Sequence, residues 1–152
     1  IGMITGNMHT TAALDRYTGY CKALQARNLP VDEVLVSEGY FTEFGGYEAM
    51  QRLLPHKPDA VFSASDAMSL GALRAIYEAG LTVPHNIALV SFDDLPPATA
   101  ARPQLTTVHQ PVHAFGVKAV EMLLDVLQNE PMPPRQIILE TKLIIRESCG
   151  AM

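Results

Sequence analysis

The chain has 152 residues, of which 48% are hydrophobic and 18% charged, so it can form one globular domain with a buried core. Its formal net charge of -5 argues against a nucleic-acid-binding surface within these residues, because phosphate contacts require clustered Lys and Arg. No apolar run approaches the roughly 20 residues that span a bilayer, so we expect no membrane partner. The two cysteines are far apart in the sequence and are expected to be reduced thiols.

Apolar runs alternate with helical periodicity along the first part of the chain. Four buried strands are expected at residues 1–5, 33–37, 60–62 and 87–92. Three helices are expected between them, at residues 11–27, 47–54 and 67–79. Because one strand and one helix repeat about every 30 residues, the pattern predicts an α/β fold with a doubly wound parallel sheet.

The first expected helix has one buried stripe, made of Leu14, Tyr17, Cys21 and Leu24. Arg16 points away from the centre of that stripe, because successive helical residues turn by about 100 degrees. Arg16 is therefore expected either in solvent or facing a cleft.

Two segments lack regular periodicity. Residues 38–46 are expected to form a loop rich in glycine and aromatic residues, in which Tyr40 and Phe41 have no pattern that would bury them. Residues 95–105 contain three prolines and are expected to be irregular.

The C-terminal part departs from the strand and helix repeat. Residues 106–108 are expected to be extended, and Pro111 is expected to start a helix. The apolar stripe of this helix is Val112, Phe115, Ala119, Met122, Leu123 and Val126. Three prolines are expected to end it, namely Pro131, Pro133 and Pro134. Residues 137–139 and 143–145 are then expected to be strands.

The stretch from Ala60 to Ala79 is the leading candidate for a ligand site. Its order is strand, turn and helix, with Ser65 able to cap the helix and Asp66 at the first helical position. Ligands of open α/β sheets bind just outside the carboxyl ends of the strands, where this turn lies. Asp66 is therefore the leading candidate for a ligand contact, and the alternative is that Asp66 only caps the helix.

Sequence signals for enzymatic chemistry are weak. The phosphate-binding loop, the dinucleotide fingerprint and the G-x-S-x-G elbow are all missing, so no cofactor is expected. His109 and His113 are four residues apart but lack the carboxylate of a metalloprotease motif. Asp93 and Asp94 follow a strand and could hold a magnesium ion or act as acid and base, but no nucleophile or lysine stands in a recognisable setting beside them.

Several segments resemble, in order and spacing, the effector-binding core of the lactose and galactose repressor family. They are S-A-S-D-A-M-S-L-G-A-L-R-A-I from Ser63, G-L-T-V-P-H-N-I-A-L-V-S-F-D-D from Gly80 and P-Q-L-T-T-V-H-Q-P from Pro103. Arg16 and Gly19 also resemble the R-x-x-G of the first helix in that family, and residues 39–50 resemble the loop and helix after its second strand. The chain departs from the family pattern at three positions, with Ser65 in place of Asn, Asn86 in place of Asp and Ser91 in place of Gly.

The resemblance implies a fold like that of type I periplasmic binding proteins, in which two doubly wound subdomains close on a small ligand. Residues 1–109 would belong to the C-terminal subdomain. Residues 110–130 would be a helix of an N-terminal subdomain that is otherwise missing here, and residues 131–152 would return to the C-terminal subdomain. The apolar stripe of that helix would then lie uncovered, so we expect it to dock or swap onto a second chain, or the chain to be a proteolytic piece of a longer protein.

The resemblance also implies roles for four residues. Asp66 and Arg16 would hydrogen-bond the hydroxyl or carboxylate groups of a ligand, Phe41 would stack on its ring, and Asp93 would lie at the mouth of the cleft. A sugar site needs such planar hydrogen-bonding groups and an aromatic face. The alternatives are a solvated Arg16 and a Phe41 that only packs its loop, whereas Asp94 is expected to be structural.

The function implied by the resemblance is a non-catalytic effector-binding domain of a cytoplasmic transcriptional regulator. A sugar-like ligand would close the two subdomains and change operator affinity, while a DNA-binding headpiece would lie outside this chain. Homodimerisation is expected, with the helix at 67–79 as a candidate interface. The alternatives are a periplasmic sugar-binding protein of a transporter and a small α/β enzyme using Asp66, Asp93 or Asp94.

Overall fold

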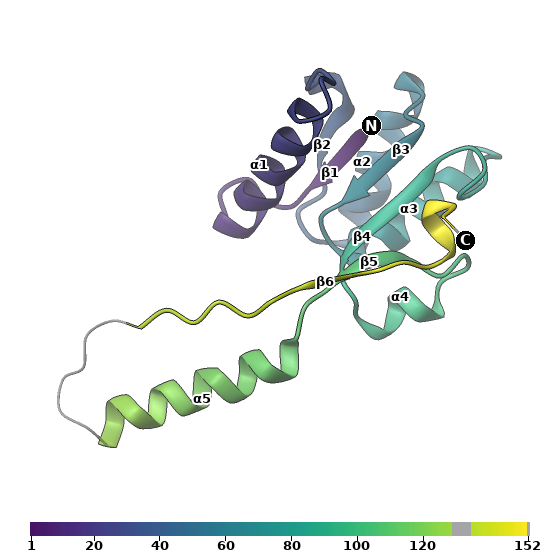
Figure 1. The fold of residues 1–152 in the computed structure, drawn as a ribbon. Helices are drawn as coiled ribbons and strands as arrows, with labels where there is room; N and C mark the ends of the chain where they lie inside the picture. Colours follow the sequence, from purple (N-terminus) through teal and green to yellow (C-terminus); the bar gives the residue numbers. More distant parts are fainter. Residues whose placement is uncertain (129–134, 152) are drawn as a thin grey trace.

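A six-stranded sheet forms the centre of the computed structural model, which describes residues 1–128 and 135–151 (Figure 1). The strand order is β2-β1-β3-β4-β5-β6. The strands are β1 Gly2–Thr5, β2 Val36–Glu38, β3 Ala60–Ser63, β4 Ala88–Asp93, β5 Thr106–His109 and β6 Lys142–Ile144. The first five are parallel and β6 runs antiparallel to β5, so the predicted parallel sheet is confirmed.

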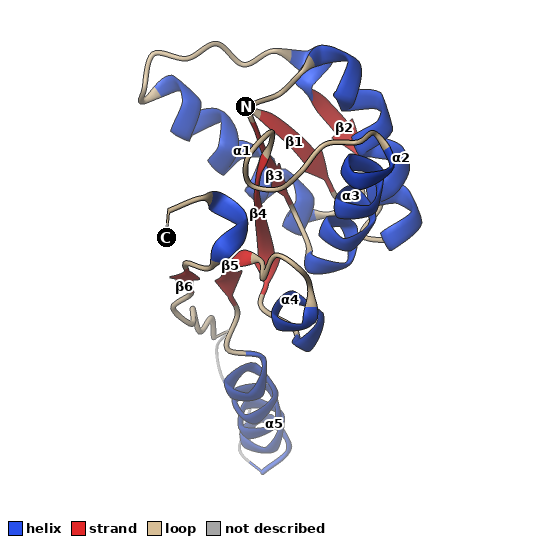
Figure 2. Ribbon diagram, turned by 90° about the vertical axis from the view of Figure 1, so that its right-hand side faces the viewer, coloured by secondary structure: helices blue, strands red, loops and turns tan. Residues whose placement is uncertain are grey.

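Helices cover both faces of the sheet, which makes it doubly wound as predicted. They are α1 Thr11–Gln25, α2 Glu43–Leu53, α3 Asp66–Glu78, α4 Pro96–Ala100 and α5 Val112–Gln128. α1 lies on one face of the sheet, and α2 and α3 lie together on the other (Figures 1 and 2). The buried core between these layers includes Met3, Ile4, Met50, Met68 and Ile76.

The unit of β3 and α3 forms as its sequence predicts. The side chain of Ser65 accepts a hydrogen bond from the backbone N–H of Met68 at 3.3 Å and so caps the helix. The apolar residues that recur every three or four positions along α3 are all buried, namely Met68, Ala72, Leu73 and Ile76. Gly80 ends the helix in a left-handed conformation, with φ of 74°.

The second βα unit differs from its prediction at two boundaries. Residues 33–35 form a 3-10 turn, because the Asp32 side chain accepts the N–H of Val34, and the strand is confined to β2. The helix after it begins at Glu43, four residues earlier than predicted. Thr42 caps α2 through the N–H of Gly45, and both Gly45 and Gly46 are helical.

Three further expectations need correction. Of the stripe expected in α1, Leu24 is buried and Tyr17 and Cys21 are partly buried against the core, but Leu14 is 45% exposed, and Ala13 and Tyr20 are buried in addition. The irregular stretch at 95–105 contains α4, which begins with two prolines at positions that need no N–H donor. Residues 137–139 form no strand, and the predicted helix end at 131–134 lies outside the described residues.

α5 projects away from the rest of the structure (Figures 1 and 2). The predicted helix is confirmed, but none of its described residues is buried, and four members of its apolar stripe are among the exposed large side chains, namely Val112, Phe115, Leu123 and Val126. Within the described residues, neither α5 nor another helix combines the length and hydropathy needed to cross a membrane.

Candidate effector site

Polar and aromatic side chains gather where β1, β3, β4 and β5 end. These strands are parallel, so their carboxyl ends meet at one edge of the sheet. Arg16 reaches this edge from α1, Phe41 from the loop before α2, Asp66 from the start of α3 and Asp93 from the end of β4. The structure therefore brings all four predicted site residues to the same edge.

Arg16 contacts residues from several of these elements. Its Nη1 donates a 2.8 Å hydrogen bond to the carbonyl of Ala64 after β3, and its Nη2 lies 3.6 Å from Oδ1 of Asp93. The guanidinium carbon lies 4.0 Å from the ring centroid of Phe92 and 5.6 Å from that of Phe41. Only 15% of the side chain is exposed, so Arg16 faces a cleft and is not a solvated helix residue.

Phe41 is held in place by its backbone and by a glycine. Its φ of 61° is positive, and its ring lies directly over Gly6, in the turn that follows β1. A Cβ at position 6 would overlap that ring, so glycine is required there. Phe41 is partly buried against the core, yet its ring remains beside Arg16 at the edge of the sheet.

Asp93 carries the negative charge that faces Arg16. Burial raises the pKa of Asp93, while a hydrogen bond from Gln110 and the charge of Arg16 act to lower it. Burial also lowers the pKa of Arg16, and the charge of Asp93 opposes that change. The Gln110 contact, at 2.6 Å to Oδ1, was missed by the sequence analysis. The position of Gln110 directly after β5 was the available signal, because β5 pairs with β4 and the last residues of the two strands, His109 and Asp93, are partners.

Asp66 lies deeper than the other three residues, with 1% of its surface exposed. Its Oδ1 accepts hydrogen bonds from the hydroxyls of Ser91 at 2.5 Å and Thr107 at 3.1 Å. Its Oδ2 accepts the backbone N–H of Leu95 at 2.7 Å. These partners belong to the protein, and direct contact of Asp66 with a ligand stays a prediction. The side-chain cap of α3 is Ser65, whereas the bonds of Asp66 reach residues of β4, β5 and the segment after β4.

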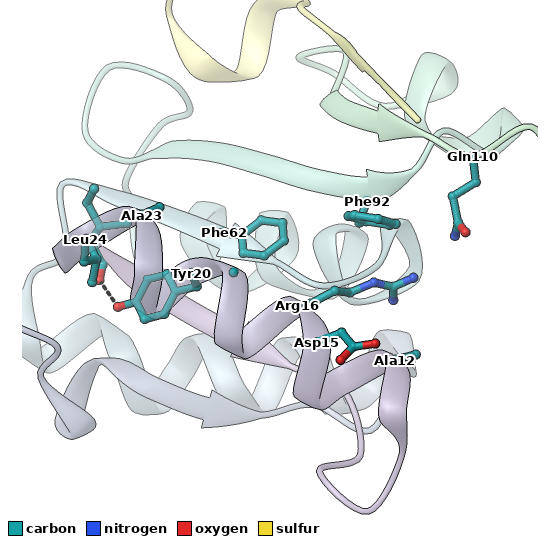
Figure 3. A pocket seen from close by; sticks show the side chains of 11 residues that line it. Ala12, Asp15, Arg16, Tyr20, Ala23, Leu24, Phe62, Phe92 and Gln110 are labelled. Atoms are coloured by element: carbon teal, nitrogen blue, oxygen red, sulfur yellow. Dashed lines mark hydrogen bonds between the residues drawn. The ribbon is translucent and has the colours of Figure 1, made fainter. Parts of the chain in front are cut away.

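A groove of about 680 Å³ opens beside this edge, between α1 and the strands β3 and β4 (Figure 3). Arg16, Phe92 and Gln110 line the end of the groove nearest the strand ends. Tyr20 and Phe62 line it further along the helix. Of the four predicted site residues, Arg16 alone lines the groove, while the other three border the sheet edge next to it.

Asp94 contacts protein groups on both sides, as expected for a structural residue. Its Oδ2 lies 2.9 Å from Nδ1 of His109, and its Oδ1 accepts a 2.7 Å hydrogen bond from Nη2 of Arg146. Within residues 1–128 and 135–151, no group of three or more His, Cys, Asp or Glu side chains is arranged to hold a metal ion.

A doubly wound sheet with a charged and aromatic cluster at its strand ends has the architecture of small-molecule-binding domains of the periplasmic binding protein type. Residues 1–149 match the family described as "Periplasmic binding protein-like domain". The chain therefore belongs to this family, and the expected fold is confirmed.

Its relatives are transcriptional regulators of the LacI family. Over 150 residues the chain is 41% identical to the HTH-type transcriptional regulator CelR of Thermobifida fusca and 39% identical to the repressor PurR of Escherichia coli. Each alignment covers 97% of this chain and 44% of the relative, so the chain spans less than half the length of these proteins.

Solved structures give the same result. The structure titled "transcriptional regulator CelR-cellobiose complex" superposes with a TM-score of 0.93 at 40% identity, over 97% of this chain and 46% of that one. A lac repressor dimer bound to operator and the anti-inducer ONPF superposes with a TM-score of 0.89 at 29% identity, over 99% and 52% of the two chains. The family expected from the sequence is confirmed by these matches.

Proposed function

We propose that this chain is the effector-binding C-terminal subdomain of a LacI-type transcriptional regulator, and that Arg16, Phe41, Asp66 and Asp93 form its ligand site. The observation that carries the proposal is Arg16, whose side chain is largely buried beside the rings of Phe41 and Phe92 and is paired with Asp93 at the strand ends. Such an arginine offers several N–H donors in a fixed plane, which suits a ligand with neighbouring hydroxyl groups.

The charge balance of the site favours a neutral, hydroxyl-rich ligand. Asp93 compensates the charge of Arg16, and Asp15 adds a further carboxylate to the wall of the groove. An anionic ligand would meet both carboxylates, whereas sugar hydroxyls can donate to them and accept from Arg16. The rings of Phe41 and Phe92 offer apolar faces to the C–H groups of a sugar. The relative solved with cellobiose supports this ligand class.

We infer that residues 1–109 and 131–152 form the C-terminal subdomain, and that the helix within 110–130 packs in a second subdomain. The support is that none of the described residues of α5 is buried against the sheet, and that the relatives are about twice as long as this chain. DNA binding would reside in a headpiece outside this chain. In this proposal the protein is a cytoplasmic, non-catalytic homodimer, with the exposed side of α3 as the candidate interface.

Thermal denaturation of the full-length regulator that contains this chain, with a panel of sugars beginning with cellobiose, tests the proposal. A ligand at 100 times its dissociation constant should stabilise the protein by about 2.7 kcal/mol. Arg16→Gln is expected to abolish that shift. The matched control is Arg74→Gln, because Arg74 is an exposed arginine on α3 whose guanidinium also lies near an aromatic ring, that of Tyr47.

Two results would overturn the proposal. The first is that no sugar in the panel shifts the unfolding temperature of the protein. The second is that Arg16→Gln responds to a sugar as strongly as Arg74→Gln does. Asp66→Ala is a further variant, and its loss of stability without ligand is expected to be larger than that of Arg16→Gln, because it leaves two buried hydroxyl donors and the partly buried N–H of Leu95 without an acceptor.

A further inference from the structure

The groove beside α1 extends well beyond the charged cluster at the strand ends. Its α1 residues run from Ala12 to Leu24, a length of about 18 Å given the rise of an α-helix. Arg16 lies near the end of the groove at the strand ends, while Tyr20, Leu24 and Phe62 line the rest (Figure 3). One sugar ring bound at Arg16 would therefore leave most of the groove empty.

The two parts of the groove differ in chemistry. The part at the strand ends contains the charged side chains of Asp15 and Arg16 and the amide of Gln110. The part beyond Arg16 is lined by Gly19, Tyr20, Ala23, Leu24, Phe62 and Ile1. Of these residues Tyr20 alone has a polar side-chain group, and its hydroxyl already donates a 2.7 Å hydrogen bond to the carbonyl of Ile1. The groove is therefore polar at one end and apolar along the remainder.

Phe62 gives the apolar part an aromatic floor. Its neighbours in β3, Val61 and Ser63, are buried on the side of α2 and α3, so Phe62 points to the opposite side, where it is only partly buried. The facing wall is open at Gly19, because no atom lies within 4 Å of a Cβ added there. Free space and an aromatic surface thus meet in the same part of the groove.

We propose that this apolar part is a subsite for the aromatic aglycone of a glycoside whose sugar lies at Arg16. The inference rests on the proposed function for the position of the sugar. An aromatic ring between Phe62 and α1 would remove apolar surface from water on both of its faces. A second sugar at the same place would lose water from its hydroxyl groups, and the described residues that line this part offer it no free side-chain donor.

Isothermal titration of the full-length regulator that contains this chain tests the subsite. The probes are methyl β-glucoside and phenyl β-glucoside, which share the sugar and differ in the aglycone. The phenyl compound is expected to bind about tenfold tighter, because its ring leaves water for an apolar surface. In Gly19→Leu the added side chain occupies the open wall of the groove, so the two glucosides should bind equally.

Thr18→Leu is the matched control, because Thr18 is the exposed neighbour of Gly19 on α1 and does not line the groove. It should keep the preference for the phenyl compound. Ala23→Leu, one helical turn further along the same wall, replaces Gly19→Leu should that variant not fold. The inference is overturned if the parent protein binds both glucosides equally, or if the blocking variant keeps the preference of the parent.

A second measurement applies if neither glucoside binds. Phenol alone is then titrated against the same protein, and the methyl signals of Leu24 are followed by NMR. Shifts that Gly19→Leu abolishes would establish the subsite although glucose is not the sugar that Arg16 binds. Signals that stay unchanged, or that shift equally in Gly19→Leu, would refute the subsite. Equal binding of both glucosides, by contrast, refutes the subsite alone and leaves the proposed function in place.

Discussion

Arg16 and Asp93 are both partly buried. Burial lowers the pKa of Arg16 and raises the pKa of Asp93, and in both cases it favours the neutral form. Their separation of 3.6 Å is longer than a short charged hydrogen bond, so mutual attraction compensates only part of the desolvation. In the proposed ligand site, ligand hydroxyls would bridge the two groups and supply the hydrogen bonds that water would otherwise make.

Replacing Asp93 by Asn is expected to stabilise the ligand-free protein at neutral pH. Because the pKa of Asp93 is raised by folding, the folded state binds the proton more tightly than the unfolded chain. The free energy of unfolding therefore falls as pH rises from the ordinary aspartate pKa through the raised one. Asp93→Asn removes this loss, so its advantage should be present at pH 7 and vanish below about pH 4.

Urea denaturation at several pH values measures this difference. Asp15→Asn is the control, because Asp15 is an exposed carboxylate on the same helix as Arg16, and its free energy of unfolding should stay within about 0.5 kcal/mol of the parent. If Asp93→Asn were less stable than the parent at pH 7, attraction to Arg16 would outweigh burial, contrary to this account.

Site residues could be predicted from the sequence only where a local pattern marked them. Ser65 and Asp66 follow an apolar strand and start a helix, so their position was predictable. The helical period placed Arg16 off the buried stripe but could not choose between solvent and cleft. That choice is made by Phe92 and Asp93, which are distant in the sequence and meet Arg16 only because the strands are parallel.

At the scale of elements, α2 and α3 pack with their backbones in close contact. A Cβ on Gly46 would overlap the backbone of Met68, and a Cβ on Gly71 would overlap the carbonyl oxygen of Glu43. This contact explains why the start of α2 was predicted too late. Gly45 and Gly46 predict a loop because glycine has a low helix propensity. Here both lie in α2, and at Gly46 only glycine lets the backbone of α3 approach so closely.

Gly71→Ala is expected to destabilise the protein by about 2 to 4 kcal/mol, because the added methyl forces the two helices apart. Gly19→Ala is the matched control within a helix, since no atom lies within 4 Å of its added Cβ. It should raise the free energy of unfolding by about 0.5 to 1 kcal/mol through helix propensity. Equal effects of both substitutions in urea denaturation would contradict close packing of α2 on α3.

At the scale of the molecule, two apolar surfaces are incompletely covered. One lies on the sheet and the other on α5. Residues of β3 and β4 that face α2 and α3, such as Val61 and Leu89, are buried, whereas Phe62 and Phe92 on the α1 face are only partly covered. The second surface is α5. The alternation of strands and helices predicted the parallel sheet, but the periodicity of α5 could show only that the helix has an apolar face, and not what that face contacts.

The uncovered face of α5 should make the 152-residue chain associate in water, because exposed apolar patches of this kind drive self-association. We expect sedimentation velocity to show mass that rises with protein concentration. Leu123→Gln combined with Val126→Gln, two exposed positions one helical turn apart, should lower that association. The midpoint of sheet unfolding should not change, since α5 buries no described residue.

Exchanging Lys118 and Glu121 gives the matched control for these substitutions. The two side chains form an exposed 2.7 Å ion pair on the same helix, and the exchange keeps both the pair and the net charge while leaving every apolar residue in place. Association should therefore persist in this variant. If the exchange disperses the chain as well as the glutamine variant does, charge arrangement and not apolar surface governs association, and α5 needs no apolar partner.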